Sequence, residues 1–417
     1  MTIGASFSSI LNEYSPNQLF MEEAKDRMWA MSNIEHDQNW LGGSLVVTFE
    51  GSQASSVEFG AMAETTDVSE DVFVKGTVTT YAECFGTMKF LEKDIYQHGK
   101  LNSQNLVKLL PDRIDHFMDH FSDVASLNII NGKRICKITS VTDAASGIFV
   151  VDRIERLRIG QKVSLLDNNT ASVNAFVKTI NKDTGAVTLS ATRGGAAANY
   201  GTDYTLAQVP RLEWAGAAAS GCSSLRNSLL SSANGGSSSL YGTTKTAYPY
   251  LQAQNIDGSG VTTANLLDKI FDGLLKTRQR GRGKPETCLM SPTNFGVVLK
   301  LLEAGKGAFH QDPKSAKIGV YGWDEISIWN PVGGGLKLVC LHEMDDDVIH
   351  FLDTRPSVMK IYSNGGIRKR VAPDGKEYYE VRATTGFSYY VDINFQFEFV
   401  LQRPSYCGVM YDIPSLA

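Results

Sequence analysis

Residues 102–132 read NSQNLVKLLPDRIDHFMDHFSDVASLNIING and form the longest periodic stretch of this 417-residue chain. Apolar residues recur every three or four positions, a spacing that places them on one stripe of an α-helix. The stripe consists of Leu106, Leu110, Ile114, Phe117, Phe121, Val124 and Leu127. The opposite face carries Asp112, Arg113, Asp115, Asp119 and Asp123. We therefore predict one long amphipathic helix that acts as a structural spine.

The ends of this helix carry residues that suit helix caps. Asn102 or Ser103 can begin it, because a short side-chain oxygen accepts a free N–H of the first turn. Asn131 and Gly132 can close it, since both tolerate the left-handed conformation of a C-terminal cap. Pro111 removes one backbone donor and disfavours helix at the preceding residue. It predicts either a kink near residues 109–111 or a helix that starts at Pro111.

The segment before the helix, residues 42–90, predicts an extended hairpin. Its strands are SLVVTFEGS (44–52) and VFVKGTVTTYAECFGTMKF (72–90). Between them lies SSVEFGAMAETTDVSED (55–71), which is rich in small and acidic residues. An isolated two-stranded hairpin is marginally stable in water, so one of this length needs a surface to lie on. A neighbouring subunit is the natural candidate.

Residues 1–41 contain few periodic apolar positions. Trp29 and Trp40 are large apolar groups in a segment with no obvious core of its own. One interpretation is a frayed terminus. The other is an arm that buries its aromatic residues on another part of the fold or on another subunit.

Residues 137–210 differ in character from their surroundings. Short alternating strands are separated by turn-forming sequences at 167–169 and 183–185. This pattern predicts a small antiparallel barrel or sandwich inserted into the rest of the chain. The following residues, 215–247, are small and polar, and predict a linker or a mobile loop, part of which could be ordered only in an assembly.

From residue 258 the pattern becomes mixed α/β. A helix over 258–281 is expected to be capped by Thr262 or Thr263, and a second helix begins at Pro292 with Ser291 as its cap. Short strands are expected at ETCLMSP (286–292), EISIWN (325–330), LKLVCLHEM (336–344) and DVIHFLD (347–353). The turn PVGGG makes the middle two a hairpin. Residues 378–411 are strand-like throughout.

Composition limits the classes of function. Apolar residues make up 42% of the chain and charged residues 20%, which is enough for a sizeable core. The net charge of −5 argues against a protein that coats nucleic acid, because such a protein needs a basic surface. Six cysteines without CxxC spacing indicate reduced, mostly buried thiols in a cytosolic setting. No apolar run approaches the roughly 20 residues of a membrane span, and no secretory signal is present.

A search for catalytic and metal-binding patterns finds no convincing site. His116 and His120 have the spacing of a metal pair but lack a HExxH context, so a polar helix face is the better interpretation. Ser223 and Ser224 lack the GxSxG elbow of a nucleophile. The basic sequence RQRGRGK (278–284) is not a phosphate loop, and basic residues are favoured at a helix C-terminus in any case. The acidic run 345–347 has no identifiable partner ligands. We predict no catalytic, cofactor-binding or metal-binding residues and no cofactor.

The order of the segments is distinctive, and three motifs give it a family resemblance. The helix ends in LNIING (127–132), MSPTNF (290–295) joins a strand to a helix, and DINFQFEFVLQRPSYCGVMYDI (392–413) places Arg-Pro before a last apolar turn. Together they resemble the major capsid proteins of tailed bacteriophages, the family with the HK97-type shell fold. The segment 137–210 departs from the minimal fold of that family and is expected to be an insertion.

The resemblance implies an α+β HK97-like capsid fold with six parts. They are an N-terminal arm (1–41), an extended hairpin (42–90), the spine helix of a peripheral domain (91–136), an inserted β domain (137–210), an axial α/β domain (211–365) and returning strands (366–417). It implies no enzymatic activity. The chain would assemble into pentamers and hexamers of an icosahedral head around double-stranded DNA.

The resemblance also implies partners and a location. The partners would be copies of the chain itself, a separate scaffolding protein, a portal and a decoration protein, with only weak non-specific contact to packaged DNA and none to a membrane. The protein would reside in the virion after assembly in the host bacterial cytoplasm. Three alternatives stay open: an encapsulin-like cellular shell, a β-rich binding or fibre module suggested by 137–210, and a hydrolase using His342 with 345–347.

Overall fold

The computed structural model gives the chain two compact units, one formed by residues 1–130 with 222–417 and the other by residues 131–221. The described residues are 21–22, 27–38, 40, 44–52, 72–78, 81–91, 103–143, 146–166, 172–198, 211–215, 223–304, 318–319, 322–323, 325–329, 335–371, 379–383 and 386–416. Among the described residues, strands outnumber helices, and one part of the chain is an all-β barrel. The predicted α+β class is confirmed.

The long helix, α5, spans Ser103–Asn131. It continues through Pro111, so the prediction that it starts at that residue is wrong, although proline costs one helical hydrogen bond there. It ends at Asn131, and Gly132 follows with a φ of +70°, as predicted for the cap. Asn102 and the Ser103 side chain lie outside the described residues. Burial of the apolar stripe of α5 can outweigh the loss of the one hydrogen bond at Pro111.

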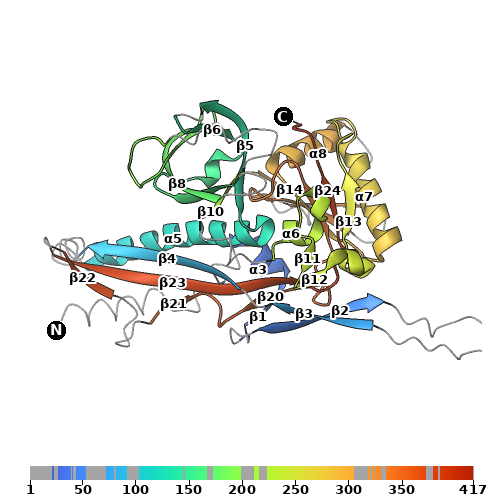
Figure 1. Ribbon diagram of the computed structural model, residues 1–417, viewed down its shortest axis with the longest axis horizontal. Helices are drawn as coiled ribbons and strands as arrows, with labels where there is room; N and C mark the ends of the chain where they lie inside the picture. The colour runs from blue at the N-terminus through green and yellow to red at the C-terminus, as the bar shows by residue number, and fades with distance from the viewer. Residues whose placement is uncertain are drawn as a thin grey trace, which may run out of the picture. The chain divides into compact units, whose positions relative to one another are not determined.

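A sheet built on one long strand covers the apolar stripe of α5 (Figure 1). Strand β23 (Gly386–Leu401) pairs antiparallel with β4 (Ala82–Leu91) over ten residue pairs. Its other edge pairs successively with β22 (Tyr379–Ala383), β21 (Arg368–Lys369) and β20 (Met359–Ser363). The short strand β1 (Glu35–Asp37) joins β20 in parallel.

Helix and sheet meet at a glycine. A Cβ atom on Gly86 of β4 would lie 2.5 Å from the ring of Phe117, so only glycine allows this approach. Phe117 stacks on Phe121, one turn later in α5, with ring centroids 5.8 Å apart. Ile114 and Met118 are also buried in this core. The apolar stripe of the sequence is therefore the face that packs on the sheet.

The predicted second strand of the hairpin, residues 72–90, is in fact two strands with different partners. Strand β3 (Val72–Val78) pairs with β2 (Leu45–Ser52) in the hairpin, whereas β4 leaves it to join β23. The sequence-based boundary fails because both parts have the same β-forming composition. The hairpin tip, 53–71, lies outside the described residues.

The described part of the N-terminal arm packs on its own chain. Helix α3 spans Trp29–Asn33, and Ala30 and Met31 within it are buried in the core under the long sheet. Trp40 is buried and makes an edge-to-face contact with Tyr81, at 5.6 Å between ring centroids. Of the two interpretations of this segment, burial on another part of the fold holds for these residues.

Residues 131–221 contain a closed barrel, where the sequence predicted a barrel or a sandwich. Its strands, in the order β10-β5-β6-β9-β8-β7, enclose a core of their own. Their bounds are β5 Arg134–Asp143, β6 Ile148–Val151, β7 Lys162–Leu166, β8 Ser172–Asn181, β9 Ala186–Ser190 and β10 Arg211–Trp214, with the 3-10 turn η1 at Ile154–Arg156. The entry and exit of the barrel are adjacent, because the Trp214 amide donates to the Lys133 carbonyl at 3.0 Å.

A second sheet, in the order β13-β24-β19-β14-β18-β17, organises the mixed α/β part. Its bounds are β13 Gln254–Asp257, β14 Thr287–Met290, β17 Glu325–Trp329, β18 Gly335–Cys340, β19 Ile349–Leu352 and β24 Gly408–Tyr411. The predicted β17–β18 hairpin is confirmed. A small pair, β15 Ile318–Gly319 and β16 Gly322–Trp323, is also present.

Two helices accompany this sheet. Helix α7 spans Leu266–Gly281, and its N-cap position is Asn265 rather than the predicted Thr262 or Thr263. The Asn265 side chain instead accepts a hydrogen bond from the Thr262 amide at 2.7 Å, which fixes the turn before the helix. Helix α8 spans Pro292–Ala304, and the predicted cap Ser291 accepts from the Asn294 amide at 3.3 Å.

The described part of the small, polar segment 215–247 is folded rather than a linker. From residue 223 it forms a short helix and several turns within this chain alone. They are α6 Leu225–Leu229, η3 Ser232–Asn234, β11 Ser239–Leu240, β12 Thr243–Thr244 and η4 Lys245–Ala247, followed by η5 Pro249–Leu251. A further 3-10 turn, η6, spans Pro404–Tyr406 between β23 and β24. Composition alone predicts a linker here because the contacts that order the segment come from distant residues.

The first prediction concerns the contact between helix and sheet. Replacing Phe117 with Asp places a charge in this apolar contact, at a cost of several kcal/mol. We expect insoluble or unfolded protein, measured by solubility and circular dichroism. The control His116→Asp changes the exposed neighbour on the same helix and should fold normally. A folded Phe117→Asp variant with unchanged unfolding free energy would contradict the role of this face.

The second prediction concerns the barrel. Because Lys133 and Trp214 are hydrogen-bonded, a short Gly-Ser linker can replace residues 134–213 without stretching the chain. We expect the remaining unit to stay folded, with a cooperative thermal transition seen by circular dichroism. Loss of all cooperative unfolding in the shortened chain would show that the two units do not fold independently.

Candidate assembly surfaces

The base of the hairpin is fixed by an aromatic stack. Phe49 of β2 lies parallel to Tyr241, with 5.3 Å between the ring centroids, and Gly76 of β3 leaves room for the Phe49 ring and for Cβ and the carbonyl oxygen of Tyr241. The Tyr241 hydroxyl accepts from the Leu401 amide at 2.8 Å and donates to the Phe399 carbonyl at 3.3 Å. The hairpin is thus anchored to β23 through Tyr241. Val46, on its opposite face, is 57% exposed.

The outward face of the β4–β23 pair carries a polar ladder around one exposed aromatic ring. Glu83 accepts from Asn394 at 2.7 Å, and Thr87 donates to Asp392 at 2.6 Å. Phe85 stands between these pairs and is 77% exposed, the largest exposure among the large apolar side chains that the structure describes. An apolar residue this exposed on an ordered sheet face is a candidate contact for another chain.

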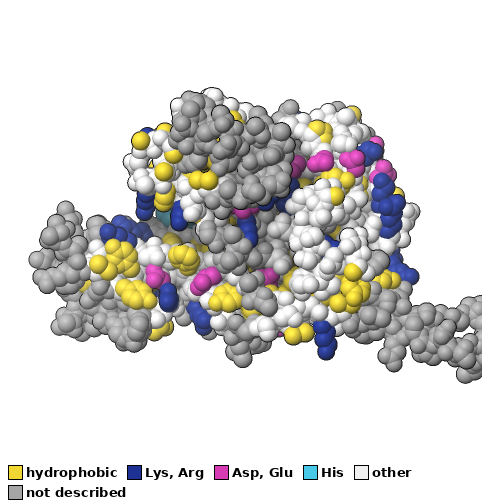
Figure 2. Space-filling view, viewed as in Figure 1, with side chains coloured by type: hydrophobic (Ala, Val, Ile, Leu, Met, Phe, Trp, Pro, Cys, Tyr) yellow, Lys and Arg dark blue, Asp and Glu magenta, His cyan; other side chains and the backbone are white. Residues whose placement is uncertain are grey.

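Residues 278–284, at the C-terminus of α7, form a basic surface. Figure 2 shows Lys and Arg side chains gathered along the edge of the molecule where α7 lies. Arg278 donates to the carbonyls of Arg282 and Gly283 and so caps the helix end, as the helix-dipole interpretation predicts. Arg280 and Arg282 line a groove of about 680 Å³.

The acidic run 345–347 has a structural partner that the sequence analysis missed. Arg226 of α6 contacts Asp345 at 3.2 Å and forms a two-pronged pair with Asp347 at 3.1 and 3.0 Å. Burial beside this arginine lowers the pKa of His350 to about 3, so its imidazole is neutral. A lone arginine more than a hundred residues away gives no local signal of this pairing.

The other predicted site residues do not converge on a reaction centre. His116 and His120 are exposed on α5. His342 is 61% exposed and lies 3.5 Å from both Asp123 and Glu343. Ser224 caps α6 by accepting from the Asn227 amide.

Among the residues that the structure describes, no three His, Cys, Asp or Glu side chains lie close enough together to hold a metal ion. No described helix is long and apolar enough to cross a bilayer. The described cysteines are free thiols, and Cys136, Cys288 and Cys407 are buried.

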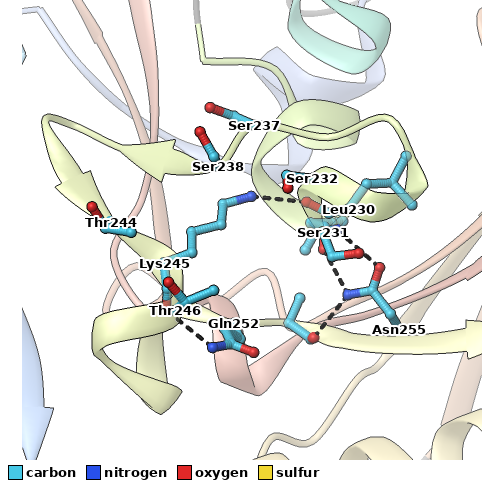
Figure 3. A pocket seen from close by; sticks show the side chains of 12 residues that line it. Leu230, Ser231, Ser232, Ser237, Ser238, Thr244, Lys245, Thr246, Gln252 and Asn255 are labelled. Carbon is cyan, nitrogen blue, oxygen red and sulfur yellow. Dashed lines mark hydrogen bonds between the residues drawn. The ribbon is translucent and has the colours of Figure 1, made fainter.

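A buried lysine holds the segment after residue 223 in place. The Lys245 ammonium donates to the carbonyls of Asn227, Ser228 and Leu230 at 2.8–2.9 Å, where α6 ends. Figure 3 shows the bond to Leu230. Burial lowers the pKa of Lys245 to about 8, which still leaves it charged at neutral pH. The adjacent cavity of about 270 Å³ is lined by groups that bond within the segment, such as Asn255. Its chemistry is that of a structural anchor.

The point where the chain leaves the barrel and returns to the first unit rests on a buried carboxyl group. Glu398 of β23 is 2% exposed, and its Oε1 accepts from the Ser223 amide at 2.9 Å. Burial raises the pKa of Glu398 to about 8, although the hydrogen bonds from Ser223 oppose this shift. Glu398 is therefore largely protonated at neutral pH in the folded chain.

Known proteins give the following comparisons. No protein-family model and no curated protein matches the chain. Among solved structures, a chain of the cyanophage A-1(L) capsid asymmetric unit is 10% identical with a TM-score of 0.48, covering 91% of each chain. A capsid chain of a native GTA particle is 8% identical with a TM-score of 0.45, covering 94% of this chain and 91% of that one. The virus-like particle from Pyrococcus furiosus is 6% identical with a TM-score of 0.43, covering 98% and 100%.

The third prediction follows from Glu398. Its folded pKa of about 8 exceeds the ordinary carboxyl value, so its contribution to stability is complete below about pH 4 and declines as pH rises through 8. Glu398→Gln keeps an acceptor for Ser223 and removes the titration. We expect the variant to be more stable than the wild type above pH 8 by roughly 3–5 kcal/mol. Urea unfolding from pH 5 to 9 measures this, and parallel pH profiles of the two proteins would refute it.

Proposed function

We propose that this chain is a structural subunit that self-assembles into a closed shell, as the major capsid protein of a tailed-phage head. The observation that carries the proposal is the β2–β3 hairpin. Its base is anchored by Phe49 and Tyr241, while its outer face exposes Val46. Two strands alone are marginally stable, so such a hairpin is best satisfied by a surface on a neighbouring copy.

The rest of the first unit suits a shell subunit. Helix α5 and the β4–β23 pair make a rigid bar, and the exposed Phe85 and the basic end of α7 offer separate surfaces for contact. Different surfaces that meet head to tail generate rings, and rings of five and six close into an icosahedral shell. Many weak contacts add up to a stable particle. A net charge of −5 limits adhesion to the double-stranded DNA that such a shell encloses.

In this proposal the parts of the chain keep the roles expected from the sequence, except that the hairpin ends at Val78 because β4 joins β23. Residues 1–41 are the arm, 42–78 the extended hairpin, 91–136 the spine, 137–210 the insertion, 211–365 the axial domain and 366–417 the returning strands, with which β4 pairs. A separate scaffolding protein, a portal and a decoration protein are the proposed partners. Assembly takes place in the host bacterial cytoplasm.

Expression of the chain with and without its scaffolding protein tests the proposal. We expect pentamers, hexamers or shells by electron microscopy and analytical ultracentrifugation. A chain that stays monomeric under both conditions would overturn the proposal. Particles that contain cargo protein and no DNA in their native host would instead identify an encapsulin-like cellular shell.

The fourth prediction separates folding from assembly. Deleting residues 58–70 removes most of the hairpin tip and leaves the Phe49–Tyr241 anchor intact. We expect a folded monomer with unchanged thermal stability and at least about a tenfold loss in the yield of particles. The loss is large because every subunit lacks the same contact, and the missing contacts add up over the whole particle. Normal assembly, or loss of monomer folding, would contradict a hairpin that works between subunits.

A further inference from the structure

Charge is distributed unevenly between the two units. Residues 131–221 contain eleven Lys and Arg and seven Asp and Glu, whereas the remaining residues contain 29 and 38. The barrel unit is therefore basic within an acidic chain. A basic unit attached to an acidic protein is suited to an acidic partner.

Part of this basic charge gathers at one turn of the barrel. The Gly160 amide donates to the Val177 carbonyl at 2.7 Å, and the Val177 amide donates to the Gln161 carbonyl at 2.9 Å. These bonds hold the turn before β7 against β8. Lys162 lies opposite Phe176 in the β7–β8 register, and Lys178 directly follows Val177, at a bulge in β8.

An arginine from another loop completes the group. Gly160 has a φ of +81°, and a Cβ atom there would lie 3.3 Å from Nε of Arg193, so the guanidinium lies over the turn. Arg158 and Ile159 precede Gly160 and are exposed, Ile159 to 70%. We define the basic patch as Arg158, Lys162, Lys178 and Arg193 around Ile159.

Among the described residues, the acidic side chain that is nearest to Arg158 in sequence pairs with an arginine outside the patch. It is Glu155, which contacts Arg153 at 3.6 Å between Oε1 and Nη1. Arg158 donates to the Glu155 backbone carbonyl rather than to its carboxylate. An exposed aliphatic side chain on a turn that also carries basic groups is the composition of a contact surface with an acidic, partly apolar partner.

The chain itself contains a segment of matching chemistry. Residues 53–71 carry Glu58, Glu64, Asp67, Glu70 and Asp71 and no Lys or Arg, and they also include apolar residues that suit Ile159. We propose that the basic patch of the barrel binds the hairpin tip, residues 53–71, of a second copy of this chain. The inference rests on the proposed function, since it requires copies to assemble.

Nucleic acid is the competing polyanion. A DNA-binding surface is expected to spread over many phosphates, and the exposed Ile159 next to Arg158 has no role in contacting phosphate. The hairpin tip supplies both carboxylates and apolar side chains. The contact should weaken as salt rises, because exposed charges are screened over about 8–10 Å at physiological ionic strength.

Carbodiimide crosslinking of assembled full-length particles tests the contact directly. The reagent joins a lysine ammonium to a nearby carboxylate as an amide, with loss of water. We expect mass spectrometry to find Lys162 or Lys178 joined to Glu64, Asp67 or Glu70. Particles assembled from mixed ¹⁵N-labelled and unlabelled chains should give crosslinked peptides of mixed label. Particles without these crosslinks, or with crosslinks of a single label only, would overturn the inference.

A charge exchange supplies the independent test. Arg158→Glu with Arg193→Glu, or Glu64→Lys with Asp67→Lys, should each reduce the crosslinks and the rate of particle formation at least about tenfold, because like charges then face each other. The four changes combined should restore the rate of particle formation and give new crosslinks between positions 158 or 193 and positions 64 or 67. Lys182→Glu, on the exposed β8–β9 turn outside the patch, is the control and should have little effect. Circular dichroism verifies that every variant folds.

The outcomes separate this inference from the proposed function. A wild-type chain that forms no particles refutes the function and the inference together. Normal particles from both charge-reversed variants refute the inference alone. Retention of a DNA fragment by the wild type, lost on Arg158→Glu with Arg193→Glu and without any barrel–hairpin crosslink, would assign the patch to nucleic acid instead.

Discussion

The contact between α5 and the long sheet is the constraint on which the first unit depends. Gly86 lets the ring of Phe117 approach the β4 backbone, and the alternate residues of β23 complete the same core. Strand β23 then pairs on its other edge with β20, β21 and β22, and β20 in turn pairs with the N-terminal strand β1. A disturbance at this contact would therefore reach the hairpin through Tyr241 and the N-terminal segment through β20 and β1. The stiffness of the unit follows from one shared strand.

Buried polar and charged groups, rather than apolar packing alone, fix the chain where it returns from the barrel. Within a short segment, Ser223 binds the carboxyl group of Glu398, Arg226 binds two aspartates, and Lys245 caps α6. Each of these groups is costly to bury without its partner, so a misplaced segment would leave unpaired polar groups or charges in the core. The polar contacts thus select one arrangement for a sequence that has few apolar residues to guide it.

Local patterns predicted the features that depend on local spacing. The stripe of α5, the Ser291 cap and the β17–β18 hairpin all depend on residues close together in sequence, and the structure contains each of them. The failures share the opposite property. The division of residues 72–90 depends on β23, three hundred residues away, and the order of 223–247 depends on Glu398 and Asp345. The exposed Phe85 carries no sequence signal, because the same composition would suit a buried strand.

The adjacent ends of the barrel have a consequence for how the chain can change over evolution. Since the Trp214 amide is hydrogen-bonded to the Lys133 carbonyl, the two chain segments that enter and leave the barrel form a two-stranded stem. Such a stem lets a domain be acquired, lost or exchanged as one genetic cassette, without altering the register of the strands in the first unit. The same property makes this position a practical graft point for attaching a foreign domain to the chain.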